Sequence, residues 1–270
     1  MNIVQKEIFG EIEAFQLGFG PFGRPLMSVY MYWVDGHLVD TGQRNMQATV
    51  IRLLSVKKID GILLTHHHED HSGNAAAIRR LYDVGVTGHP ETGRLMKSGF
   101  SIRPYQFYVW GRADRTEMVP FGCIYETERF RLKPIHTPGH SKDHTVYLEE
   151  SNGWLFSGDL YLGDKIKYFR ADEQLAEQIN SLKKVLQFDF ESIFCAHRPC
   201  LQNGKIRLQS KLSFLEDFYG NILLMIQKGY SERAIIRKFS SGQDRLVKWV
   251  TLGNASFANM VRSALRSAQA

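Results

Sequence analysis

The stretch Thr65-His66-His67-His68-Glu69-Asp70-His71-Ser72-Gly73 decides how the rest of this chain is interpreted. It follows an apolar run over 59–65 that is typical of a buried strand, and it leads into a helical pattern over 71–82. A loop at the end of such a strand can turn His66, His68, Asp70 and His71 into one pocket. Imidazole and carboxylate are ligands that zinc prefers, and a loop can serve two separate centres. The stretch therefore predicts a metal site.

Four further polar segments also follow expected strands. The flanking pattern predicts strands over 29–34, 38–39, 130–136, 145–148, 154–157 and 192–196, with an Asp35-Gly36 hairpin turn between the first two. The segments that end these strands are Val39-Asp40-Thr41-Gly42, Thr137-Pro138-Gly139-His140, Ser157-Gly158-Asp159 and Cys195-Ala196-His197.

Helical patterns over 46–56 and 172–187 alternate with these strands, which favours a layered α/β architecture. The C-terminal part differs, because it shows only helical patterns, over 210–228, from Ser231 to Phe239 and over 254–267. We expect a domain over residues 1–205 and a helical, winged-helix-like appendage over 206–270.

Composition indicates a globular protein, since 43% of the 270 residues are hydrophobic and 23% are charged. No apolar run reaches the roughly 18–20 residues that a bilayer span needs. The first twenty residues place Lys6, Glu7, Glu11 and Glu13 where a signal peptide would be apolar. We therefore expect a cytoplasmic protein without a membrane partner.

Charge is distributed unevenly along the chain. Residues 1–197 carry 22 Lys and Arg against 24 Asp and Glu, whereas residues 198–270 carry 12 against 4. Such a basic excess suits either a polyanion-binding surface or the solvated face of ordinary helices, and the sequence leaves both interpretations open.

The order and spacing of these segments over residues 25–200 resemble the metallo-β-lactamase superfamily of metal-dependent hydrolases. The resemblance implies a four-layer αββα sandwich with two divalent metal ions at one edge, zinc by preference and iron or manganese as alternatives. It also implies the ligands: His66, His68 and His140 for one ion, Asp70, His71 and His197 for the other, and Asp159 between both.

Two such ions can lower the pKa of a bridging water, so the resemblance implies hydrolysis by a metal-bridging hydroxide. In that scheme Asp70 accepts a proton or steers the hydroxide, and Asp40 orients a ligand histidine or the loop. Arg198, His144 and Tyr161 are candidate substrate contacts.

The substrate is left open between a small ester, thioester or lactone and a phosphodiester. The His140-Ser141-Lys142-Asp143-His144 and Ser157–Gly163 segments resemble the β-lactamase-like protein 2 group, which implies cleavage of single-stranded RNA, with the basic C-terminal region on the nucleic acid. A lesser alternative is a non-catalytic nucleic-acid-binding protein with structural metals. Asp159 stands where β-lactamases with a cysteine ligand carry that cysteine, which argues against antibiotic hydrolysis. The oligomeric state stays open.

Overall fold

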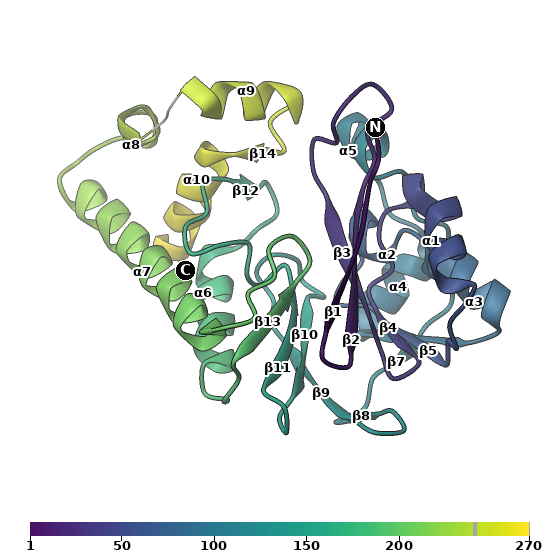
Figure 1. Cartoon of the computed structure of the whole chain (residues 1–270). Coiled ribbons are helices and arrows are strands. Elements are labelled where there is room, and N and C mark those ends of the chain that lie inside the picture. Colours follow the sequence, from purple (N-terminus) through teal and green to yellow (C-terminus); the bar gives the residue numbers. More distant parts are fainter. Residues whose placement is uncertain (240–241, 270) are drawn as a thin grey trace.

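The computed structural model describes residues 1–239 and 242–269. Two β-sheets lie face to face, and helices cover the outer face of each, so the expected four-layer αββα arrangement is confirmed (Figure 1). The strands are β1 (Ile3–Phe9), β2 (Ile12–Gly18), β3 (Val29–Val34), β4 (His37–Val39), β5 (Gly61–Leu63), β6 (Gly85–Gly88), β7 (Val119–Pro120), β8 (Tyr125–Glu126), β9 (Arg131–His136), β10 (Thr145–Glu149), β11 (Trp154–Gly158), β12 (Phe169–Arg170), β13 (Ser192–Cys195) and β14 (Ala255–Ser256).

The helices are a short 3₁₀ turn (Arg44–Met46), α1 (Gln47–Leu54), α2 (Glu69–Ser72), α3 (Ala75–Tyr82), α4 (Pro90–Ser98), α5 (Pro104–Val109), α6 (Leu175–Val185), α7 (Gly204–Gln227), α8 (Glu232–Phe239), α9 (Gly242–Val250) and α10 (Phe257–Gln269).

The first sheet has the order β1-β2-β3-β4-β5-β6-β7, with antiparallel pairs up to β4 and parallel pairs after it. The second has the order β13-β11-β10-β9-β8, in which only β11 and β13 are parallel. Because β4, β5, β11 and β13 end at the same edge of the sandwich, the loops that follow them meet there.

Successive side chains of a strand point to opposite faces of its sheet, and those that point inward form the layer between the two sheets. Tyr32, Tyr147, Phe156 and Phe194 point inward from both sheets and are almost completely buried. Tyr32 makes edge-to-face contacts with Phe156 and Phe194, with 5.4 Å between the ring centroids of Tyr32 and Phe194, and Phe156 stacks on Phe194. This layer fixes the distance between the two sheets, and thus the position of the loops that each contributes.

The C-terminal helices pack onto the second sheet. Leu208, Leu212 and Leu215 of α7 and Met260 and Val261 of α10 belong to the same apolar cluster as α6 and β13. Within the described residues, the C-terminal region contains four helices, α7 to α10, and not the three expected. The additional helix is α9, which was not predicted. The predicted boundary after residue 205 falls in the first turn of α7, and the division into two domains stays a prediction.

Other differences from the predicted elements are local. The β1–β2 hairpin was not predicted, although its seven-residue register is regular. The helix expected over 71–82 is divided into α2 and α3 at Gly73-Asn74, and the helix expected from residue 210 begins at Gly204. In residues 1–239 and 242–269, no helix combines the length and apolar character that crossing a membrane requires.

Candidate metal centre

Histidine and aspartate side chains from four strand ends meet at one edge of the sandwich. The loop after β5 and the short α2 carry His66, His68, Asp70 and His71, and the loops after β9, β11 and β13 add the others. Ligand atoms converge in a first group of His66, His68 and His140 and a second group of Asp70, His71 and His197, and a further set of His66, His71 and Asp159 overlaps both. All seven predicted metal-ligating residues, Asp159 included, therefore come together.

Nitrogen atoms of the first group lie unusually close to one another. His68 Nδ1 is 2.8 Å from His66 Nε2 and 3.1 Å from His140 Nε2. Nitrogens bound to one tetrahedral zinc at 2.0–2.1 Å would be about 3.3 Å apart. Burial is the main cause that lowers the pKa of His66 and of His68, so both rings are neutral and offer lone pairs. This geometry and protonation fit a cation.

The second group is organised around carboxylates. Asp70 Oδ2 lies 3.2 Å from His197 Nε2 and 3.8 Å from His71 Nε2. Although desolvation opposes it, the charge of Asp159 raises the pKa of His197 to about 9. The carboxylates Asp40, Asp70 and Asp159 likewise outweigh the burial of His71 and raise its pKa. A strongly negative environment of this kind attracts positive charge, either protons or a metal ion.

Asp159 lies between the two groups. Its Oδ2 is 3.3 Å from His140 Nε2, whereas its Oδ1 is 3.5 Å from His71 Nε2 and 3.6 Å from His197 Nε2. Oδ1 and His71 Nε2 are buried and have no hydrogen-bond partner. Buried polar atoms without partners are costly, and a cation between them would satisfy both. The residues present therefore fit two metal ions with a shared carboxylate.

A second layer of hydrogen bonds holds the ligands. Asp40 Oδ2 accepts from His71 Nδ1 at 2.7 Å and from Thr65 Oγ1 at 2.8 Å, and its Oδ1 accepts from the Thr65 backbone N–H at 2.8 Å. The other end of the site is fixed similarly, since His197 Nδ1 lies 2.8 Å from the Ser28 carbonyl oxygen. Asp40 thus contacts His71 and the histidine loop.

Asn74, which follows the histidine loop, makes hydrogen bonds to the loop after β4. Its side-chain amide donates to the backbone carbonyls of Thr41 and Gln43 at 2.8 and 3.0 Å. Thr41 Oγ1 in turn donates to the His71 carbonyl at 2.8 Å. The loop after β4 is therefore tied to the loop that carries the ligands.

His144 has a different place from the one expected. It is fully buried, its Nδ1 contacts Thr137 Oγ1 at 2.8 Å, and its Nε2 accepts from the Asp159 backbone N–H at 3.0 Å. Burial lowers the pKa of His144 to about 3, which keeps Nε2 an acceptor. We correct the expected substrate contact: both nitrogens are engaged, and His144 supports the loop of Asp159 from behind.

The turn at Gly158 depends on the same support. Gly158 has φ +46°, and a Cβ there would lie 2.8 Å from Thr65 Oγ1 and 2.9 Å from His144 Nε2. Only glycine therefore fits at the last position of β11, directly before Asp159.

Two candidate substrate contacts lie beside the centre. Tyr161 is 4% exposed and donates from its hydroxyl to Asp164 Oδ1 at 2.7 Å. Arg198 follows His197 and, with Tyr161 and Asp164, lines a surface cavity. His67, in contrast to its neighbours, turns away from the ligand groups and pairs with Asp143 at 2.9 Å.

Three charged residues near the centre were not predicted. Glu173 Oε2 lies 3.5 Å from His140 Nδ1. Glu69 is buried and accepts from Gln106 Nε2 at 2.6 Å, and Arg170 acts electrostatically on both Glu69 and His68. Glu69 stands within the histidine stretch and could have been noticed there. Nothing local in the sequence marks Glu173 or Arg170, which reach the site from the segment before α6.

Comparison with known proteins agrees with this geometry. Residues 27–197, more than half of the chain, match the Metallo-beta-lactamase superfamily. The chain belongs to this superfamily and carries the histidine–aspartate cluster of a metal-dependent hydrolase.

The sequence is also similar to that of individual proteins of known name. The chain is 31% identical over 201 residues to a β-lactamase-like protein 2 homolog of Drosophila melanogaster, covering 70% of this chain and 66% of that protein. It is 24% identical over 203 residues to an atrochrysone carboxyl ACP thioesterase of Aspergillus fumigatus, covering 74% and 58%. These matches span somewhat less than two thirds of the relatives' lengths.

Among solved structures, a β-lactamase domain protein from Burkholderia ambifaria superimposes with a TM-score of 0.69 at 15% identity, covering 97% of this chain and 88% of that one. The similarity confirms the fold.

Proposed function

We propose that this protein is a dinuclear metal-dependent hydrolase whose substrate is an acyl thioester or a related small ester. The observation that carries the proposal is the position of Asp159, which presents one carboxylate oxygen to each ligand group. Structural zinc sites are closed by four protein ligands, whereas a shared carboxylate between two groups leaves room for water and substrate. This favours catalysis over the alternative of structural metals.

When bound, two divalent ions supply a water of lowered pKa and an electrophile for the attacked carbonyl. The chain's own residues arrange the rest. His66, His68 and His140 would hold one ion, and Asp70, His71 and His197 the other. We infer zinc for both positions, because imidazole nitrogens dominate the donor set.

Proton transfer falls to Asp70 in this proposal. Its Oδ2 faces His197 and His71, which leaves Oδ1 to accept a proton from the attacking water. Asp40 is a positioning residue, since its contacts are to His71 and Thr65. His144 and Gly158 keep Asp159 aligned with both groups.

Two observations support a small acyl substrate over RNA. One relative is named as a thioesterase. In addition, the basic residues of the C-terminal region are partly used within the fold: Lys205 pairs with Asp189, Arg207 with Asp164 and Arg262 with Glu232. Lys211 is buried. These charges are thereby withdrawn from a continuous polyanion surface.

The test measures metal content and turnover together. Purified protein is assayed on an acyl thioester, a small phosphodiester and a short single-stranded RNA, each with and without chelator. We expect two zinc ions per chain and thioester hydrolysis that chelator abolishes and zinc restores. Asp159→Ala should lose this activity. Arg52→Ala, at an exposed position of α1, should retain it. Chelator-sensitive RNA cleavage without thioester turnover would contradict the proposed substrate, and turnover that survives metal removal would contradict the proposed chemistry.

A further inference from the structure

A cavity of about 430 Å³ lies at the outer corner of the sandwich, between the loop after Asp159 and the first turns of α7. Its charged and polar lining comes from three parts of the chain: Tyr161, Asp164, Lys165, Arg198, Cys200 and Arg207. Three cationic groups thus face one carboxylate in a space the size of a small-molecule site.

The single carboxylate does not neutralise this cavity. Asp164 accepts from Tyr161 Oη at 2.7 Å through one oxygen and from Arg207 at 2.8 Å through the other. In the part of the chain that the structure describes, no carboxylate lies within 4 Å of the charged nitrogens of Arg198 or Lys165, since neither forms an ion pair. Because Asp164 pairs with Arg207, the charges of Arg198 and Lys165 are in excess in this cavity and favour an anionic ligand.

The cavity is joined to the metal centre through the backbone. Arg198 directly follows His197, and Tyr161 is the second residue after Asp159. Cys195 ties the two loops together, because its thiol donates to the Tyr161 carbonyl and its sulfur accepts from the Arg198 N–H at 3.4 Å. A molecule bound in this cavity would therefore lie beside the metal centre, without contacting the metal-ligating side chains.

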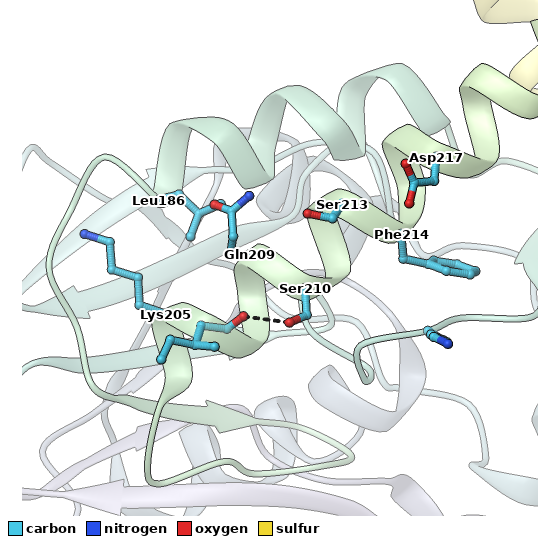
Figure 2. A pocket seen from close by; sticks show the side chains of 9 residues that line it. Leu186, Lys205, Gln209, Ser210, Ser213, Phe214 and Asp217 are labelled. Carbon is cyan, nitrogen blue, oxygen red and sulfur yellow. Dashed lines mark hydrogen bonds between the residues drawn. The ribbon is translucent and has the colours of Figure 1, made fainter.

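A second hollow adjoins the cavity and gives room for a larger ligand. It has a volume of about 690 Å³, shares Lys165 with the cavity, and extends along α7 (Figure 2). Leu186 and Phe214 give it an apolar side, Gln209, Ser210 and Ser213 provide amide and hydroxyl groups, and Lys205 and Asp217 add one charge of each sign. This mixture suits a heterocycle with polar edges better than a second phosphate.

We propose that Arg198 and Lys165 in this cavity bind the phosphate groups of a nucleotide-bearing thiol carrier, such as that of an acyl-coenzyme A, whose thioester reaches the metal centre. This inference rests on the proposed thioester hydrolysis. Guanidinium groups recognise phosphate through paired N–H donors, and Arg198 is the group with no competing carboxylate. The adjoining hollow along α7 takes the base.

Binding is tested apart from catalysis by titrating the intact zinc-loaded chain with adenosine bisphosphate in a calorimeter. Arg198→Ala and Lys165→Ala should each raise the dissociation constant at least about 10-fold, the factor expected from losing one charge-assisted hydrogen bond. Arg198→Lys should fall between them and wild type, and Arg52→Ala should bind like wild type. The Asp159→Ala variant should still bind, which separates the cavity from the metals.

Catalysis is tested with two thioesters of the same acyl group, one on coenzyme A and one on pantetheine, which has no phosphate. Arg198→Ala should raise KM for the first thioester at least about 10-fold more than it raises KM for the second. Equal binding of adenosine bisphosphate by wild type and both alanine variants would overturn the inference, as would tighter competition by an oligoribonucleotide. Cavity binding without turnover of either thioester would instead refute the proposed function and leave the phosphate site standing.

Discussion

Lys211 of α7 allows a quantitative test of how the C-terminal region supports the metal centre. The side chain is 1% exposed, and its Nζ donates to the Leu160 carbonyl at 2.6 Å, one residue after Asp159. Burial lowers the pKa of Lys211 from 10.5 to about 8. At 1.36 kcal/mol per pKa unit, this corresponds to about 3 kcal/mol between the charged and neutral forms.

The sign of the pH dependence follows from this lowered value. Between pH 8 and 10.5, the unfolded chain keeps a proton that the folded chain has released. The contribution of Lys211 to the free energy of unfolding should therefore rise with pH across this window, by up to about 3 kcal/mol. Below pH 8 both states are protonated and the full cost of the buried charge is present.

Lys211→Met should remove this rise. Urea unfolding of wild type and variant at pH 7 and pH 10, in chelator so that metal binding does not titrate as well, measures the difference. At pH 7 the variant should be more stable by about 1–2 kcal/mol, because the lost hydrogen bond to Leu160 offsets part of the gain. Lys228→Met, at the exposed end of α7, is the control. Parallel pH profiles for wild type and Lys211→Met would refute the assignment of a buried charge to Lys211.

Three other expectations concern the ligands and the core. Asp159→Ala should lose both metal ions together in elemental analysis, and loss of only one would contradict the shared carboxylate. Asp40→Asn should weaken zinc affinity about 10–100-fold by equilibrium dialysis, since it disturbs the orientation of His71; an unchanged affinity would remove Asp40 from that role. Phe156→Ala, at a fully buried inter-sheet position, should cost about 3–5 kcal/mol in urea unfolding, whereas Phe22→Ala, 91% exposed, should cost less than about 0.5 kcal/mol; similar losses in both would contradict the inter-sheet core.

Local patterns indicated the layered fold and marked the residues that gather at the candidate metal centre, whereas the resemblance to the metallo-β-lactamase superfamily implied their division between two ions. His66, His68, Asp70 and His71 lie within six residues, and His140 lies in a turn that a proline and a glycine mark. Strand ends in an α/β sandwich gather such loops at one edge, so order and strand position were enough to bring them together. The β1–β2 hairpin escaped prediction because its first strand is half exposed and mixes charged with apolar residues.

Tertiary structure alone decided what surrounds the ligands. Lys211 meets Leu160 across 51 residues of sequence, Asp40 meets His71 across 31, and Glu173 reaches His140 from before α6. The basic excess of the C-terminal region was visible in the composition, but the fold determines which of those charges is buried, which is paired and which lines a cavity. The physical reason is that ligand identity depends on side-chain chemistry and local spacing, whereas burial and electrostatic environment depend on contacts between elements far apart in the chain.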